Sequence, residues 1–224
     1  MIAIGTALIL VMPRWLMATL ITGAAIAMWW ILGSLIISHW IYDRSSLYRW
    51  NWIPRFIGSD IGRWINVHAG LDESTLAIRA AVRSDPIAVL DIFDPSEMTE
   101  PSIARARRDG IVPWPPVVWR GTDVPLEFEK IDVAFAVFCL HEIRKDEARS
   151  VLMRSLTSCL RSGGKIVVVE HMRDLANFAA FGPGFMHFLP MRRWKQTFDH
   201  AGLILEKHER ITPFVRVISL KAAT

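Results

Sequence analysis

Residues 131–174 decide the fold, and they read IDVAFAVFCLHEIRKDEARSVLMRSLTSCLRSGGKIVVVEHMRD. Residues 131–140 are apolar apart from Asp132 and rich in β-branched and aromatic side chains, which is typical of a strand buried on both faces. Residues 146–160 place apolar side chains at helical spacing, and residues 165–170 form a second apolar run. A strand, a helix and a strand without a hairpin predict a right-handed βαβ unit in a parallel sheet.

Polar side chains gather where each of these two strands ends. His141 and Glu142 follow the first strand, and Glu170 and His171 close the second. Residues 162–164, Ser-Gly-Gly, are expected to stop the intervening helix, because glycine readily takes a positive φ. In open α/β sheets, ligands bind beyond the carboxyl ends of the strands. The stretch therefore predicts an enzyme or a ligand-binding domain.

The same stretch resembles the second half of a class I S-adenosylmethionine-dependent methyltransferase. Asp132 stands where that family often has an acid opening its fourth strand. Residues 160–170, LRSGGKIVVVE, are similar to the family's L-x-P-G-G turn and fifth strand, with Ser162 in the place of the proline. The resemblance covers roughly residues 60–224. It implies a Rossmann-like α/β sheet, mostly parallel with an antiparallel closing strand, and S-adenosylmethionine as the cofactor.

Composition sets the outer bounds. A chain of 224 residues suffices for one domain of ordinary size plus an appendage. The net charge of +4 is mild, and the short arginine clusters lack a nucleic-acid motif, so no nucleic-acid partner is predicted. Cys139 and Cys159 have neither metal nor redox spacing, and they imply no disulfide framework.

Residues 1–40 differ from the rest of the chain and are predicted to be a membrane anchor. Residues 15–37 carry no charged side chain and are long enough to cross the roughly 30 Å core of a bilayer as a helix. A cleaved signal peptide fits less well, because its apolar core usually has only about 7–15 residues. Arginines are more numerous after the span than before it, so the positive-inside rule predicts a single-pass protein with a cytoplasmic domain. The arginines that follow the span are Arg44, Arg49, Arg55 and Arg63.

Residues 41–62 are predicted to be a juxtamembrane helix and linker with a break at Pro54, and residues 63–224 the methyltransferase-like domain. Five aromatic residues near this segment suit either a belt at the membrane interface or packing on the domain. They are Trp40, Tyr42, Tyr48, Trp50 and Trp52. Within the domain we expect strands over residues 63–67, 87–93 and 114–120, helices over 74–82 and 194–202, and closing antiparallel strands over 203–209 and 213–220.

The cofactor loop that the resemblance implies lies at residues 66–72. The family typically has an acid and then Gly-x-Gly-x-Gly, whereas this chain has Asn66 for the acid, His68 for the first glycine and Asp72 for the third. Only Gly70 remains of the three glycines. Glycines let the backbone approach a ligand closely, so these side chains take up space that the methionine part of the cofactor would use.

Two further acids are assigned to the cofactor through the resemblance. Asp94, in the run DPSEM, stands where the family has an acid for the ribose hydroxyls, with Asp91 as the second choice. A carboxylate can accept hydrogen bonds from both hydroxyls, but Asp94 also suits an Asx turn before Pro95, and the sequence leaves both uses open. Asp123 is the candidate for the adenine amino group.

Methyl transfer needs alignment of the acceptor and often a base for its proton. Because the two strands are expected to be neighbours, His141, Glu142, His171 and Asp174 are the predicted catalytic group, with His187 as a further candidate base. The same residues suit helix capping and structural hydrogen bonds. His and carboxylate groups also suit several divalent metals, but no metal site is assigned.

Residues 172–195 are aromatic, broken by glycine and poor in charge, which fits a lid over an apolar ligand or a buried pair of helices. The leading hypothesis is a membrane-anchored methyltransferase acting on a quinone or another lipid-soluble acceptor. The altered cofactor loop motivates a second hypothesis, amino transfer of the kind performed by the similar rhodoquinone enzymes. A third is a catalytically degenerate domain that acts as a scaffold.

Overall fold

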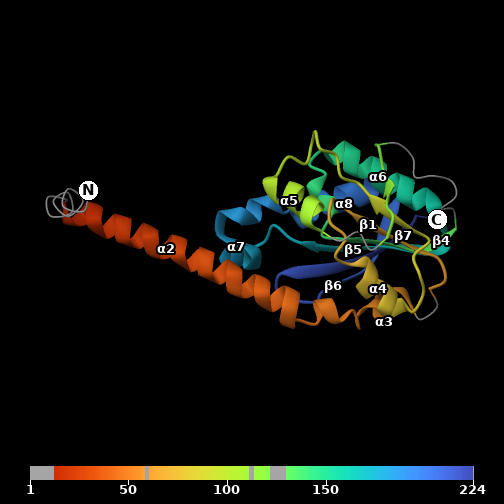
Figure 1. The fold of residues 1–224 in the computed structure, drawn as a ribbon, viewed down its shortest axis with the longest axis horizontal. Helices are drawn as coiled ribbons and strands as arrows, with labels where there is room; N and C mark the ends of the chain where they lie inside the picture. Colours follow the sequence, from red (N-terminus) through yellow and green to blue (C-terminus); the bar gives the residue numbers. More distant parts are fainter. Residues whose placement is uncertain (1–12, 59–60, 111–113, 122–129, 224) are drawn as a thin grey trace.

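The computed structural model describes residues 13–58, 61–110, 114–121 and 130–223. These residues build a seven-stranded sheet in the order β3-β2-β1-β4-β5-β7-β6, with helices on both faces (Figure 1). Neighbours from β3 to β5 pair in parallel, whereas β7 runs antiparallel to β5. The predicted α/β sheet, mostly parallel with an antiparallel closing strand, is confirmed. The strands are β1 (Trp64–His68), β2 (Ala88–Asp91), β3 (Val117–Val118), β4 (Ile131–Val137), β5 (Leu160–His171), β6 (Leu203–Arg210) and β7 (Val215–Ala222).

The last two strands differ from the prediction in one respect. Both were expected to be antiparallel, but β6 pairs antiparallel with β7 and therefore runs in the direction of β1–β5. The helices and helical turns are α2 (Arg14–His39), η1 (Trp40–Arg44), η2 (Leu47–Arg49), α3 (Ile53–Ile57), α4 (Thr75–Val82), α5 (Pro101–Asp109), η4 (Leu140–Glu142), α6 (Asp146–Cys159), α7 (Leu175–Phe181), η5 (Gly182–His187) and α8 (Met191–His200).

Two apolar cores sandwich the sheet, as the uninterrupted apolar strands require. Ala134 and Ala136 of β4 belong to the core shared with α6 and α8, while Val133 and Phe135 belong to the core on the opposite face. Successive residues of a strand point to opposite faces, so an apolar run that fills both cores has to be a central strand. The prediction of a strand buried on both faces is confirmed.

The second core contains the segment that directly follows α2. Ile41, Trp50, Trp52 and Phe56 are buried in it and pack with β4, β5 and β7. Trp50 and Trp52 therefore pack on the domain, which leaves them no place in an interfacial belt. Of the five aromatic residues considered for such a belt, Trp40 and Tyr42 are exposed and Tyr48 is half-buried.

The glycine pair after α6 works differently from the expectation. The helix ends at Cys159, before the Ser-Gly-Gly run, which forms an irregular start of β5 opposite Ile131. Gly163 takes φ +76°, and a Cβ on Gly164 would lie 2.8 Å from the carbonyl oxygen of Ile131. The glycines therefore admit a close approach of two backbones rather than capping the helix.

Helix α2 is long and apolar enough to cross a membrane, and none of its residues is buried in the protein. Its amino-terminal half extends away from the domain, and its other half runs past α7 (Figure 1). The partly buried residues of this second half recur at helical spacing on one face. They are Trp30, Gly33, Ser34, Ile37 and Ser38.

Candidate functional site

Glu170 organises the polar end of β4 and β5. It is the penultimate residue of β5 and its side chain is wholly buried. Its Oε1 accepts hydrogen bonds from the backbone N–H groups of Leu140 (3.1 Å) and His141 (3.3 Å), while its Oε2 lies 2.7 Å from Nδ1 of His141. One buried carboxylate thus fixes both the turn η4 and the ring of His141. The sequence analysis did not assign Glu170 to the site, although an acid closing an otherwise apolar strand is a visible signal.

His141 lies between two carboxylates. Its Nε2 is 3.2 Å from Oε1 of Glu142, which faces it from the opposite side to Glu170. Burial by itself would lower the pKa of His141, but Glu170 and the hydrogen bond to Glu142 outweigh burial and raise that pKa to about 10. Burial likewise opposes ionisation of Glu142, yet hydrogen bonds from His141 and His187 bring its pKa well below the ordinary value. At neutral pH the pair is therefore an imidazolium and a carboxylate.

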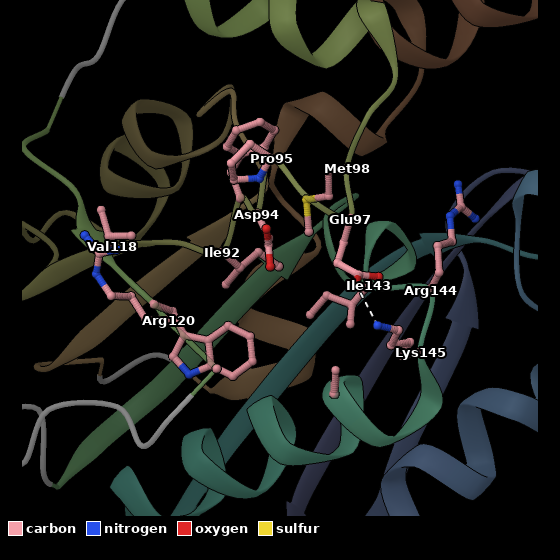
Figure 2. Close-up of a pocket in the computed structure, with 14 residues that line it drawn as sticks. Ile92, Asp94, Pro95, Glu97, Met98, Val118, Arg120, Ile143, Arg144 and Lys145 are labelled. Atoms are coloured by element: carbon pink, nitrogen blue, oxygen red, sulfur yellow. Dashed lines mark hydrogen bonds and ion pairs between the residues drawn. The ribbon is translucent and has the colours of Figure 1, made fainter.

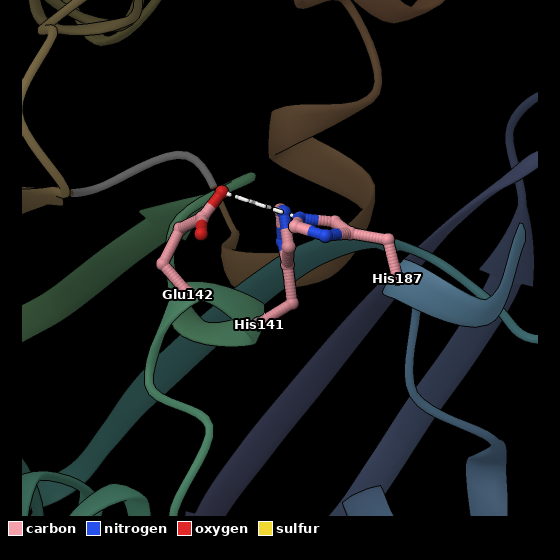
Figure 3. A group of neighbouring side chains, drawn as sticks. All are labelled: His141, Glu142 and His187. Atoms are coloured by element: carbon pink, nitrogen blue, oxygen red, sulfur yellow. Dashed lines mark ion pairs between the residues drawn. The ribbon is translucent and has the colours of Figure 1, made fainter. Parts of the chain in front are cut away.

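Glu142 also meets the segment that follows α7. Nε2 of His187, at the end of η5, lies 3.5 Å from Oε1 of Glu142 (Figure 3). The second oxygen of Glu142, Oε2, is buried and has no hydrogen-bond partner among the described residues. A buried acceptor without a donor is costly, so this oxygen is the atom of the cluster best placed to accept a hydrogen bond from a ligand.

Donor atoms of His141, Glu142 and His187 all lie within 4.8 Å of one another, as ligands of a metal ion would. Arg144, however, approaches the same atoms. Its guanidinium donates to the carbonyl oxygen of His187 (2.7 Å), contacts both ring nitrogens of His187 and lies 3.9 Å from Oε2 of Glu142. Because the protein itself brings a positive charge to these donors, and His141 is protonated, we describe the group as an ion-pair network.

His171 has a different environment from His141. Its ring stacks between Phe138 (centroids 5.1 Å apart) and Phe188 (4.7 Å). Nδ1 lies 3.1 Å from Oδ1 of Asn177, and Nε2 lies 3.3 Å from the hydroxyl of Tyr42. Burial lowers the pKa of His171, so the ring is neutral, donating through Nδ1 and accepting from the tyrosine. Both nitrogens are thus engaged by the protein.

Asp174 acts on His171 only through a neighbour. Its Oδ1 caps α7 by accepting from the backbone N–H of Asn177 (3.1 Å) and from the side-chain amide of the same residue (3.0 Å). Asn177 in turn orients His171. Oδ2 of Asp174 pairs with Arg210 at 3.2 Å. The structure therefore separates the predicted catalytic group into two parts, His141 with Glu142 and His171 with Asp174, and the sequence analysis missed the linking residue Asn177.

The loop after β1 is held by side chains where the resembling family has glycines. The side-chain amide of Asn66 donates to Oδ1 of Asp72 (3.1 Å) and to the hydroxyls of Ser74 (2.9 Å) and Thr75 (2.8 Å). Asp72 also accepts from the backbone N–H of Thr75 and so caps α4. Oδ1 of Asn66 and Oδ2 of Asp72 are buried without hydrogen-bond partners in the described part of the chain. These two oxygens suit a cationic ligand group such as an ammonium.

Helix α5 lies against this loop. Gly70 takes φ +97°, and a Cβ there would come within 2.8 Å of Ile103 and 3.2 Å of Arg107, both on α5. Arg107 also holds Asp91, the last residue of β2, at 2.6 Å. The other oxygen of Asp91 accepts from the backbone N–H of Phe93 at 3.0 Å. His68 is buried 3.8 Å from Asp91, and burial lowers its pKa.

Asp94 is placed differently. It is exposed and accepts from the backbone N–H (2.8 Å) and the hydroxyl (2.6 Å) of Ser96, which is the Asx turn that the sequence also allowed. It lines a cavity of about 390 Å³ at the ends of β2 and β3, together with Trp119 and the apolar side chains of Ile92 and Ile143 (Figure 2). This volume is within the usual range for small-molecule sites. Asp123, assigned to adenine from the sequence, lies outside the described residues.

A second cavity, of about 220 Å³, lies at the β1 loop. Tyr48, Leu71 and Glu73 line it together with Phe138, the residue that stacks on His171. The first cavity lies beyond the ends of β2 and β3, and the second beyond the ends of β1 and β4. Both are at the edge where an open α/β sheet binds its ligands. The candidate site therefore comprises a cavity at Asp94, a cavity at the β1 loop and the ionic cluster around Glu142.

Solved structures with a similar fold include S-adenosylmethionine-dependent methyltransferases. A SAM dependent methyltransferase from Aquifex aeolicus superposes with a TM-score of 0.56 at 11% identity, covering 80% of this chain and 94% of that one. A protein described as a pericyclic reaction enzyme superposes with a TM-score of 0.54 at 14% identity. The match covers 75% of this chain and 46% of that one. The O-methyltransferase NcsB1 from neocarzinostatin biosynthesis, solved with S-adenosylmethionine and a hydroxy-methyl naphthoic acid, gives 0.51 at 16% identity, covering 85% and 56%.

The present chain thus spans only about half the length of the last two proteins. No protein-family model matches the sequence, and no curated protein matches it. At these identities the likeness shows the fold, which is that of the class I S-adenosylmethionine-dependent methyltransferases.

Proposed function

We propose that the protein is a membrane-anchored, S-adenosylmethionine-dependent methyltransferase whose acceptor is a lipid-soluble molecule carrying an acidic hydroxyl group, such as a quinol. The observation that carries the proposal is the position of the two cavities beyond the carboxyl ends of the parallel strands. Beside it stands the buried Oε2 of Glu142, which accepts no hydrogen bond from the described residues and lies 3.9 Å from Arg144. Ligands of open α/β sheets bind at this edge.

The residues present suit the cofactor. Asp94, Trp119 and Ile143 line the cavity assigned to the adenosine part, where the carboxylate would accept from the ribose hydroxyls. Oδ1 of Asn66 and Oδ2 of Asp72 would accept from the ammonium of the methionine part. When bound, the cofactor supplies an electrophilic methyl group.

Glu142 would accept the hydrogen bond of the acceptor hydroxyl and orient its oxygen. His141 would act as a positioning residue, because it is protonated and holds Glu142 through Nε2 while Glu170 holds Nδ1. A carboxylate with a lowered pKa is a weak base, so the arrangement favours an acceptor hydroxyl that ionises easily. His171 and Asp174, assigned to catalysis from the sequence, would shape the aromatic wall of the site.

Anchoring rests on α2 alone. An apolar helix with no residue buried in the protein is unfavourable in water and expected in a bilayer. The orientation follows from the arginines after the helix and puts the domain in the cytoplasm. Resistance to carbonate washing tests the anchoring, and a reporter fused to the carboxyl terminus tests the orientation. Release of the full-length protein by carbonate would contradict the proposal.

Calorimetry of the full-length protein in lipid nanodiscs with S-adenosylmethionine and S-adenosylhomocysteine tests the cofactor. We expect both compounds to bind. If neither compound binds, the result would favour a scaffold without catalytic activity. A second candidate is an enzyme that uses the same cofactor for other chemistry, such as amino transfer. The crossing of α5 over Gly70, together with His68 at the first glycine position, favours it. The mass of the product distinguishes the two, since a methylated acceptor gains one CH₂.

A further inference from the structure

Helix α7 and the turn η5, residues 175–187, form a surface with exposed apolar side chains. We call this segment the lid. Residues 175–191 contain no Asp, Glu, Lys or Arg. Leu175 is 85% exposed, Met186 56% and Phe178 38%, and they lie close together in sequence on one short segment. Apolar patches of this kind mark contact sites for proteins or membranes.

The lid packs directly on α2. The ring of Phe178 meets the ring of Trp30 edge-on with centroids 5.6 Å apart. Gly182 lies so close to the same tryptophan that a Cβ would come within 2.5 Å of its ring. The partly buried face of the second half of α2 begins at Trp30. The lid therefore contacts the helix well before Ile41, the first residue after α2 that is buried in the second core. The lid is therefore packed against a part of α2 that carries no charged side chain.

The position of Trp30 sets the depth of this contact. Trp30 precedes Ile37, the last residue of the predicted span, by seven residues, which corresponds to about 10 Å along the helix axis. The hydrocarbon core of a bilayer is about 30 Å thick. If residues 15–37 cross it, an element held at Trp30 lies inside the same leaflet as the end of the helix.

We propose that the lid is inserted into the cytoplasmic leaflet beside α2 as a second, non-spanning membrane contact whose partner is the lipid acyl region. This inference rests on the anchoring described under the proposed function. Charged side chains border the lid, with Arg173 and Asp174 before it and Arg192 after it. Such residues favour the headgroup region, so the segment enters and leaves the apolar layer at its own ends.

The lid also carries a residue of the candidate site. His187 ends η5 and lies 3.5 Å from Glu142, while Arg144 holds its carbonyl oxygen. The element in contact with lipid is thus continuous with the wall of the cluster around Glu142. A lipid-soluble acceptor would pass from the leaflet along the lid to this cluster without crossing water.

Site-directed labelling of the full-length protein in vesicles of phosphatidylcholine and phosphatidylglycerol tests the inference. Leu175→Cys and Met186→Cys would each carry an environment-sensitive fluorophore, and the native Cys139 and Cys159 are buried. Leu20→Cys on α2 (55% exposed) is the lipid reference, and Leu76→Cys on α4 (56% exposed) is the water reference. Quenching is measured with acyl-brominated lipid and, separately, with aqueous iodide.

We expect the probes at 175 and 186 to be quenched severalfold more by brominated lipid than the probe at 76, and less by iodide. Probes at 175 and 186 that behave like the one at 76, while the probe at 20 is quenched by lipid, would overturn the inference and leave the anchoring intact. This result would mean that the span lies closer to the amino terminus. A probe at 20 that only iodide quenches would overturn both the anchoring and the lid insertion.

Discussion

The carboxylate of Glu170 lies 2.7 Å from Nδ1 of His141. Glu170 is near the end of β5, and His141 lies in the turn η4 that follows the neighbouring parallel strand β4. The contact is buried, and Glu142 occupies the other nitrogen of the same ring. Burying a charge is unfavourable unless it is paired and hydrogen-bonded. The three side chains therefore have to be understood as one ionised unit.

Replacing Glu170 should change how stability depends on pH. The pKa of His141 is raised from 6.5 to about 10 in the folded protein, so its stabilising contribution is complete below about pH 6.5 and is lost as the pH rises through about 10. Breaking the buried pair with Glu170→Gln should cost about 3–5 kcal/mol at pH 7. Denaturation experiments at pH 7 and pH 10.5 give the free energy of unfolding at each pH. The decrease in this free energy from pH 7 to pH 10.5 should be smaller for the variant than for the wild type.

The matched control is Glu206→Gln, which removes a partly exposed carboxylate paired with Lys165 at 2.7 Å. It should lower stability by less than about 1 kcal/mol and keep the wild-type pH dependence. An equal pH dependence in Glu170→Gln and in the wild type would show that the charge of His141 is not held by Glu170.

Glu142→Gln should impair turnover without weakening cofactor binding. The amide keeps the size of the side chain but removes the charge that accepts from the acceptor hydroxyl. Loss of a hydrogen bond to a charged group costs about 1.5–3 kcal/mol, or roughly 10–150-fold in rate. Turnover with a soluble quinol and cofactor affinity by calorimetry are the measurements. Glu147→Gln, on the exposed face of α6, is the control and should match the wild type. Full turnover in Glu142→Gln would remove Glu142 from the reaction.

Asp94→Ala should weaken cofactor binding more than Asp91→Ala does. A lost hydrogen bond to a charged acceptor costs about 1.5–3 kcal/mol, or roughly 10–150-fold in affinity. Asp91 is already engaged by Arg107 and by the backbone of Phe93, so its replacement should lower the melting temperature instead. Asp85→Ala, an exposed acid paired with Arg79, serves as the control for both measurements. If Asp91→Ala weakens binding as much as Asp94→Ala, the ribose site belongs at Asp91 or is shared.

Asn66→Asp should destabilise the β1 loop even though it restores the acid that the resembling family has there. The new carboxylate could not donate to Asp72, Ser74 and Thr75 and would repel Asp72, at a cost of about 1–3 kcal/mol. Lowering the pH toward 4 should relieve the repulsion, so the gap in melting temperature between variant and wild type should narrow. Asn66→Asp with wild-type melting at pH 7 would show that the hydrogen bonds of Asn66 are dispensable.

The central strands were predictable because their pattern is local. Residues 131–140 and 165–170 have apolar side chains at every position, and only strands between two cores tolerate that. The end of α6 was predicted to within one residue, but the role of the glycine pair after it was not predictable. Gly164 is required by its close approach to the carbonyl oxygen of Ile131. That contact joins residues far apart in the chain, and the glycine pair looks the same in sequence whether it caps a helix or admits a neighbouring backbone.

The location of the candidate site could be predicted from the sequence, but most of the hydrogen-bond and ion-pair partners of its residues could not. The carboxyl ends of β4 and β5 identified His141, Glu142 and His171, since parallel strands end at one edge of the sheet. The roles of Glu170, Asn177 and Arg107 depend on side-chain directions across the fold. A sequence pattern records which residues are near each other along the chain, and it does not record which oxygen a distant arginine reaches.

The junction after α2 has a mechanical consequence. The helix passes directly into η1, and Ile41, only two residues after His39, is completely buried in the second core. The junction leaves no flexible linker between the helix and the domain. If α2 crosses a membrane as proposed, the tilt of the helix would therefore set the height and orientation of the candidate site relative to the bilayer plane. If the protein is anchored as proposed, encounter with a lipid-soluble acceptor would be a two-dimensional search within the membrane. The rate of encounter would then depend on the amount of acceptor per area of membrane rather than per volume of cell.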